Sequence, residues 1–131
     1  LNSDFIKTLI TPFYYITKEY LKNNLKHRKK FDHKGNFGHL LLVSGSKGMM
    51  GATVLSAKAA LSSGIGKLSI LSPKCGEHIL QTTVLEATLE ENIGKNHLSN
   101  IYNLKYDWLA IGPGIGTKTS TKSTFLQFPT H

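Results

Sequence analysis

The fold of this chain is constrained most strongly by one continuous stretch, in which apolar runs are separated by glycine-rich turns. It covers residues 40–71 and contains LLLVSGSKGMMGATVLSAKAALSSGIGKLSIL. The apolar run over 40–44 is typical of a strand that is buried on both faces, and 66–71 predicts a second strand. Between them, 52–63 contains good helix-forming residues and ends before Gly64, a residue type that commonly follows a helix. Strand, helix and strand with connections this short predict a parallel βαβ unit.

The rest of the chain continues this alternation. We predict one further strand, over 106–111, and further helices over 76–84, 96–104 and 117–128. The last of these helices would be capped by Thr117 or Thr119. Alternating strands and helices predict the fold class α/β, with an open, mostly parallel sheet and helices on both faces.

Composition and charge narrow the classes of function. The 131 residues are 40% hydrophobic and carry a formal charge of +8, with 16 Lys and Arg against 8 Asp and Glu. Half of the basic residues lie in the first 34 positions, and aromatic residues do not alternate with them as a base-stacking surface requires, so we expect no nucleic-acid partner. No apolar run reaches the roughly 18 residues that span a membrane, so no membrane partner is expected. The single cysteine, Cys75, suits a reducing compartment, and we predict a cytoplasmic location.

Two glycine-rich turns are the candidate ligand-binding elements. One covers 45–51 after the first predicted strand, and the other covers 112–116 after the last, so both lie where the strands of a parallel sheet end and ligands bind. Glycines expose backbone N–H groups, and each turn leads into a helix N-terminus, which attracts anions. The alternative is that the glycines only permit tight turns. Two turns on one edge, with a lysine in the first, favour an anionic ligand, and the predicted phosphate-binding residues are Gly45, Ser46, Lys47, Gly112 and Gly116.

Neither turn matches a standard nucleotide signature. The Walker loop requires a Gly-Lys pair followed by Ser or Thr, and the dinucleotide fingerprint requires Gly-x-Gly-x-x-Gly, whereas the first turn has Gly-x-x-Gly-x-x-Gly. Catalytic groups are scarce as well. His33 lies beside Lys34 in a loop, where it either contacts a phosphate or is an ordinary surface histidine, and no metal-binding spacing occurs. We therefore assign no catalytic residue and no metal ligand.

The glycine turns occur together with a third motif, and the set resembles a known family. The segment HKGNFGHLLLVSGSKGMMGATVLSAKAALSSGIGKLSIL, followed by AIGPGIG, is similar to the ADP- or ATP-dependent NAD(P)H-hydrate dehydratases, over about residues 28–117. The resemblance implies a ribokinase-like fold and a role in nicotinamide cofactor repair, with hydrated NADH or NADPH as substrate. It also implies that ADP or ATP, with Mg²⁺ as a candidate metal, phosphorylates the ring hydroxyl so that it leaves as phosphate. The substrate-binding residues that it implies are Met50, Gly51, Ala52 and Gly114.

The resemblance extends over only the N-terminal half of such a domain. After Gly116 nothing matches the family's Gly-x-Gly-Asp helix start, whose aspartate acts as general base, and 85–88 has Leu-Glu-Ala-Thr where the family usually has Pro-Glu-Ala-Met. We therefore expect 31–131 to be the N-terminal part of a truncated, inactive dehydratase domain. Residues 1–30, with a short helix capped by Thr17, are expected to be a linker that follows a missing N-terminal epimerase-type domain.

Two other functions remain open at this stage. The fold and the glycine turns also suit a ribokinase-like small-molecule kinase, although the His-Lys-Gly-x-x-Gly motif favours the dehydratase. A non-catalytic nucleotide-binding or assembly fragment is the second alternative. A half-domain would expose a sheet edge and an apolar face, so we predict self-association or a homo-oligomer.

Overall fold

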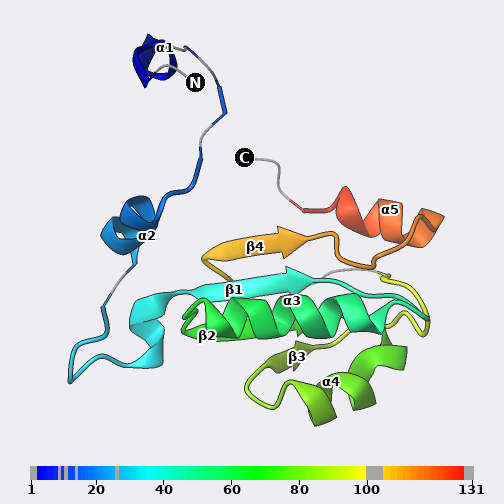
Figure 1. Ribbon diagram of the computed structural model, residues 1–131. Coiled ribbons are helices and arrows are strands. Elements are labelled where there is room, and N and C mark those ends of the chain that lie inside the picture. The colour runs from blue at the N-terminus through cyan, green and yellow to red at the C-terminus, as the bar shows by residue number, and fades with distance from the viewer. Residues whose placement is uncertain are drawn as a thin grey trace. The chain divides into compact units, whose positions relative to one another are not determined.

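The computed structural model describes residues 3–8, 10, 12–13, 15–25, 27–99 and 105–128 (Figure 1). The chain forms two compact units, Leu1–Phe31 and Asp32–His131. The first unit contains α1 (Ser3–Thr8) and α2 (Lys18–Asn24). Thr17 caps α2 as predicted, because its hydroxyl accepts a hydrogen bond from the Tyr20 amide at 3.1 Å. That this unit is a linker after another domain remains a prediction.

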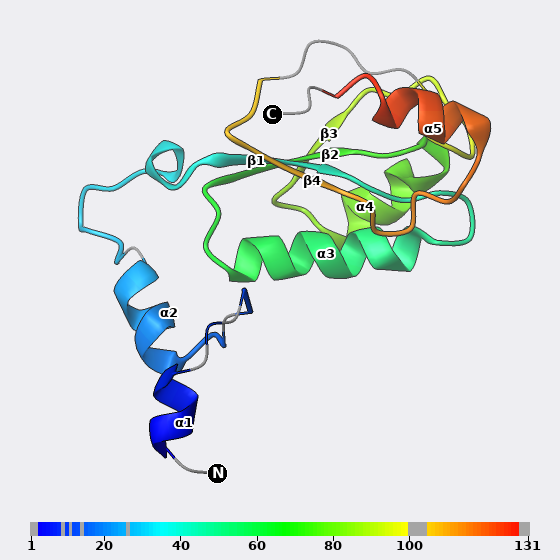
Figure 2. The same ribbon diagram turned by 90° about the horizontal axis from the view of Figure 1, so that it is seen from above.

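The second unit is built on a four-stranded parallel sheet with the strand order β3-β2-β1-β4. Figure 2 shows α3 and α4 on one face of the sheet and α5 on the other. This arrangement confirms the predicted α/β class with helices on both faces. The strands are β1 (His39–Val43), β2 (Lys67–Leu71), β3 (Thr88–Glu90) and β4 (Trp108–Ile111). The helices are η1 (Lys34–Phe37), α3 (Met50–Ser62), η2 (Lys74–Gly76), α4 (Glu77–Thr83) and α5 (Thr119–Phe125).

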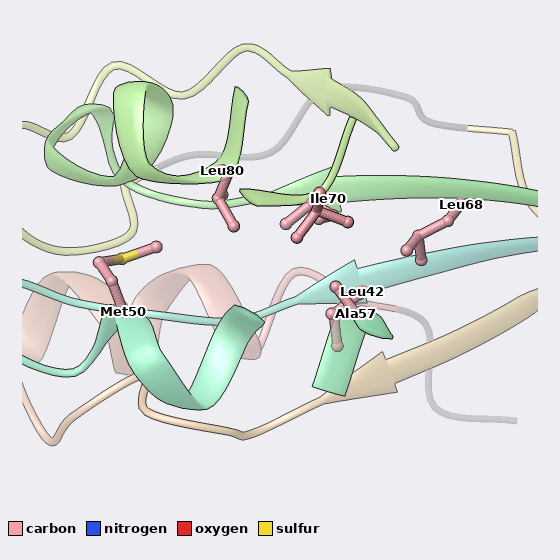
Figure 3. Packing of buried hydrophobic residues seen from close by; sticks show 7 residues of the cluster. Leu42, Met50, Ala57, Leu68, Ile70 and Leu80 are labelled. Carbon is pink, nitrogen blue, oxygen red and sulfur yellow. The ribbon is translucent and has the colours of Figure 1, made fainter. Parts of the chain in front are cut away.

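The continuous apolar run in β1 is explained by two cores, one on each face of the sheet. Successive strand residues point to opposite faces, so Leu42 packs toward α3 and α4 while Leu41 and Val43 pack on the other side. Figure 3 shows the first core, which is packed between the sheet and these helices. Its buried members are Leu42, Met50, Ala57, Leu68, Ile70, Leu80 and Val84. The second core contains Leu41, Val43, Leu71, Leu98 and Phe128.

The segment between α4 and β4 differs most from the sequence prediction. A short strand, β3, occupies Thr88–Glu90, to which we assigned no structure. The helix predicted over 96–104 is absent from 96–99, and its remaining residues, 100–104, lie outside the described part of the chain. The Asn92 side-chain oxygen accepts from the amides of Gly94 and Ser99, which holds the backbone in a non-helical turn.

The capping prediction for the last helix was also wrong. The helix exists, but it begins at Thr119, and the residue at its N-cap is Lys118, which makes no side-chain capping hydrogen bond. Thr119 therefore lies inside the first turn and Thr117 lies before the cap. Both candidate residues miss the cap position by one.

A tight loop precedes β1 and is fixed to β2 by backbone hydrogen bonds. The Gly66 amide donates to the Phe37 carbonyl at 3.1 Å, and the Lys67 amide donates to the Gly38 carbonyl at 3.0 Å. Within the loop, the His33 ring accepts from the Gly35 amide, so His33 caps η1. The structure thus gives His33 a local structural role, and its contact with a phosphate remains a prediction.

Candidate functional site

The first glycine turn leaves β1 after Val43 and leads directly into α3. Its backbone requires glycine at two positions, since φ is +93° at Gly45 and +86° at Gly48. A Cβ atom on Gly45 would stand 2.6 Å from Thr53 Oγ1 and 2.8 Å from Met50 Sδ, whereas one on Gly48 would meet nothing within 4 Å. Gly45 is therefore packed into the protein, and Gly48 faces open space.

The N-terminus of α3 is left without a side-chain cap. Met49 occupies the N-cap position and makes no capping hydrogen bond. Within the described part of the chain, the amides of Gly48, Met50 and Gly51 have no acceptor, whereas those of Lys47 and Met49 donate to Asn96 and Ser46. Free amides at a helix N-terminus favour a negatively charged ligand.

An open hollow of about 450 Å³ lies in front of these amides. Lys47 is exposed at its border, and a Cβ atom added to Gly51 would meet nothing within 4 Å. Part of its lining comes from η2 and α4, which follow β2. The lining residues are Lys47, Gly48, Met50, Gly51, Cys75 and Ile79.

The two glycine turns are joined to each other by short hydrogen bonds. The Gly45 amide donates to the Pro113 carbonyl at 2.9 Å, and the Ser46 hydroxyl donates to the Gly114 carbonyl at 2.7 Å. Ser46 itself is fully buried. The structure thus brings together the two turns that the sequence placed at the same sheet edge.

The second turn also packs directly against the start of α3. A Cβ atom on Gly114 would lie 2.7 Å from the Met49 carbonyl oxygen and 3.2 Å from Ala52 Cβ. Gly112 and Gly116 have φ of +136° and +71°, so both adopt backbone that other residues rarely tolerate. Gly114 therefore allows the second turn to approach the helix N-terminus closely, while Gly112 and Gly116 permit the backbone path of the turn.

The nine predicted site residues therefore fall into three groups. Gly51 and Lys47 border the open hollow, and Met50 lines it while being 6% exposed. Gly45 and Ser46 instead use their amide and hydroxyl groups to hold the second turn. The remaining residues, Ala52, Gly112, Gly114 and Gly116, lie at or near the junction between the turns. Ligand contacts of all nine remain predictions.

Sequence reasoning missed part of this site. Cys75 and Ile79 line the hollow, and Cys75 is a free, partly exposed thiol. The sequence could have indicated Cys75, because this residue follows β2 and therefore lies at the same edge of the parallel sheet as the two turns. The contact between the Lys47 amide and the Asn96 carbonyl carried no such signal, since it joins segments that are far apart in the sequence.

Among the described residues, no cluster of three or more His, Cys, Asp or Glu side chains could bind a metal ion. None of the described helices combines the length and apolar character that crossing a membrane requires.

The parallel sheet with helices on both faces and paired glycine turns at one edge has a ribokinase-like fold. A ribokinase-like superfamily protein from Enterococcus faecalis shares this fold, with a TM-score of 0.66 at 21% identity over 87% of this chain and 42% of that one. A family model described as NAD(P)H-hydrate dehydratase matches residues 40–130. The chain belongs to the NAD(P)H-hydrate dehydratase family.

Individual relatives agree with this assignment. The chain is 33% identical to the ADP-dependent (S)-NAD(P)H-hydrate dehydratase of Staphylococcus aureus over 115 residues, covering 86% of this chain and 41% of that protein. The ADP/ATP-dependent NAD(P)H-hydrate dehydratase of Bacillus subtilis, co-crystallised with ATP/Mg²⁺, superimposes with a TM-score of 0.68 at 29% identity, covering 83% of this chain and 39% of that one. The chain thus spans about two fifths of the length of these relatives.

Proposed function

We propose that this chain supplies the ligand-binding glycine turns of an ADP- or ATP-dependent NAD(P)H-hydrate dehydratase, and that the whole protein repairs hydrated NADH or NADPH. The observation that carries the proposal is the close packing of Gly114 against the uncapped N-terminus of α3. Relatives whose names state this activity support the choice of reaction.

The chemistry of the site suits a phosphorylated ligand. The free amides of Gly48, Met50 and Gly51 lie at the N-terminus of α3, where the helix dipole is positive. Lys47 adds a full positive charge at the border of the hollow. In our proposal Met50, Gly51, Ala52 and Gly114 contact the hydrated dinucleotide. The nucleotide phosphates then lie toward Lys47, Gly112 and Gly116, and the backbone around Gly45 and Ser46 completes the phosphate-binding turn.

We propose that this chain binds and positions the ligands but does not catalyse their conversion. Dehydration requires a phosphoryl transfer to the ring hydroxyl and a base that removes a proton, and neither turn contains a carboxylate or an imidazole. The two turns also offer no carboxylate to Mg²⁺, so we assign no step to a metal.

Calorimetric titration of the chain with hydrated NADPH, ADP and ATP tests the proposal. We expect saturable binding of hydrated NADPH and of at least one nucleotide, and no binding of adenosine, which lacks the phosphates. The same mixtures should show no recovery of dihydronicotinamide absorbance. Absence of saturable binding for all phosphorylated ligands would overturn the proposed function, and turnover would overturn the assignment as a binding part alone.

The arrangement around the site is also a proposal. We propose that residues 1–30 connect the dehydratase part to an epimerase-type domain, that the protein acts in the cytoplasm, and that copies associate. A relative from Moorella thermoacetica, 31% identical over 115 residues, is named a bifunctional NAD(P)H-hydrate repair enzyme, and this chain covers 22% of it, which supports a second domain in the whole protein. Light scattering tests the association, and a monomer at all concentrations would contradict it.

Replacing Lys47 with alanine should weaken ADP binding about fivefold, because a charge-assisted contact to phosphate is lost while the backbone amides remain. The effect should shrink as salt is added, since the ammonium group is exposed. Lys58→Ala, which removes an exposed lysine from the body of α3, is the matched control and should leave the affinity unchanged. Equal affinities for the Lys47 and Lys58 variants would remove Lys47 from the site.

Replacing Gly51 with alanine should separate stability from binding. Alanine favours the helix by about 0.5 kcal/mol at such a position, and its methyl group meets no protein atom within 4 Å. The same methyl would stand in the hollow in front of the free amides, so affinity for hydrated NADPH should fall about tenfold, or about 1.4 kcal/mol. Ser62→Ala at the other end of α3 is the control, with stability changed and affinity preserved. Unchanged affinity in Gly51→Ala would show that the ligand does not occupy the hollow.

A further inference from the structure

Two buried hydroxyl groups lie behind the glycine turns, where no ligand can reach them. Ser44 and Thr53 are both 0% exposed. Ser44 Oγ lies 2.6 Å from the Pro113 carbonyl oxygen and 3.0 Å from Thr53 Oγ1. These atoms belong to the residue directly after β1, the second turn and the start of α3, so two hydrogen bonds join three segments that are up to 69 residues apart.

The directions of these hydrogen bonds follow from the protons available. A carbonyl oxygen only accepts, so the single hydroxyl proton of Ser44 goes to Pro113, and the Thr53 hydroxyl donates to Ser44. The Pro113 carbonyl also accepts from the Gly45 amide at 2.9 Å, so it has two donors. The result is an ordered chain of hydrogen bonds from Thr53 through Ser44 to Pro113, in which both hydroxyl groups are buried.

We propose that Ser44 and Thr53 are positioning residues that fix the second glycine turn against the N-terminus of α3, and that they thereby set the affinity of the site for its anionic ligand. The identity of that ligand rests on the proposed function. The positioning itself rests only on the hydrogen bonds and on the burial of the two hydroxyl groups.

The packing explains why a small movement of the second turn would change binding. The space between Gly114 and α3 is already filled, with the Met49 carbonyl 2.7 Å from the place a Cβ atom would take. A turn that loses its hydrogen bonds would therefore move away from the N-terminus of α3 and not toward it. Loss of the Thr53 hydroxyl would leave Ser44 Oγ without a donor, and loss of the Ser44 hydroxyl would leave Pro113 with the Gly45 amide alone.

The test compares four variants at two readouts. Thr53→Val and Ser44→Ala remove the hydroxyl groups, and Thr53→Ser retains one while losing the methyl group. Thr124→Val is the matched control, because Thr124 is 2% exposed and its hydroxyl donates to the Ser120 carbonyl within α5. The readouts are amide hydrogen exchange of Gly45, which reports the contact between the turns, and the affinity for ADP and hydrated NADPH.

We expect Thr53→Val and Ser44→Ala to speed hydrogen exchange of the Gly45 amide, and this increase should be about tenfold larger than the increase for the amides of β2. Both variants should also weaken ligand binding about tenfold. Thr53→Ser should restore most of both losses, and Thr124→Val should lower stability without either effect. If Thr53 had a purely structural role, Thr53→Val and Thr124→Val would have the same effect on Gly45 exchange and on ligand affinity. That result would overturn the proposal. Faster exchange with unchanged affinity would also overturn it.

The two proposals fail in different ways. If the unmodified chain binds none of the ligands, the proposed function is wrong, whatever the variants do. The exchange of the Gly45 amide then still decides whether Ser44 and Thr53 position the second turn, because that measurement needs no ligand.

Discussion

Replacing Gly45 with alanine is expected to destabilise the second unit by about 3 kcal/mol, because two penalties act together at this position. The backbone has a φ of +93°, which alanine adopts at a cost of about 1 kcal/mol or slightly more. The added methyl group would also stand within 2.6–2.9 Å of Thr53 Oγ1, Met50 Sδ and Ser72 Oγ. All three neighbours are buried, so none can move aside freely. Urea unfolding followed by circular dichroism measures the change.

Gly64→Ala separates the two penalties. Gly64 has the same φ of +93°, but a Cβ atom there would meet nothing within 4 Å, so only the backbone cost of about 1 kcal/mol applies. The difference between the two variants therefore measures the crowding around Gly45. If Gly45→Ala and Gly64→Ala lower the free energy of unfolding by the same amount, the first turn is not packed tightly on Thr53 and Met50.

The main elements of the second unit could be predicted because local signals and tertiary packing agree there. The apolar run of β1 and the helix formers of α3 lie between glycines that stop each element, and the observed bounds differ from the predicted ones by at most two residues. The strand β3 was missed because it has three residues and is held by pairing with β2, which leaves no periodic pattern in its own sequence. The helix predicted from Asn96 is absent over 96–99, where the side-chain oxygen of Asn92 accepts hydrogen bonds from two amides.

The site was predictable in outline and not in its contacts. Glycine spacing and the topology of parallel sheets were sufficient to place both turns at one edge. They could not reveal that Gly45 and Ser46 face inward to the second turn, because their partners, Pro113 and Gly114, are 68 residues away along the chain. Nor could they reveal the buried bridge through Ser44, since an isolated serine at a strand end is equally typical of a solvent-exposed turn.

The largest loss of stability is expected for Gly66→Ala. A Cβ atom at this position would overlap the backbone carbonyl oxygen of Lys34, and the Gly38 carbonyl oxygen lies 3.1 Å away on another side. Neither obstacle is a flexible side chain, so the loop before β1 would have to detach from the start of β2. The hydrogen bonds from Gly66 to Phe37 and from Lys67 to Gly38 would then break, for a total cost of at least about 3 kcal/mol.

Urea unfolding again provides the measurement, with Lys67→Ala as the control in the same segment. Lys67 is exposed, and its backbone amide makes the hydrogen bond to the loop, so removing its side chain should change the free energy of unfolding by less than about 0.5 kcal/mol. Hydrogen exchange adds a local test, because detachment of the loop should expose the Lys67 amide in Gly66→Ala more than the amides in the middle of β2. If Gly66→Ala is as stable as the Lys67→Ala control, the loop before β1 is not fixed to β2 by these contacts.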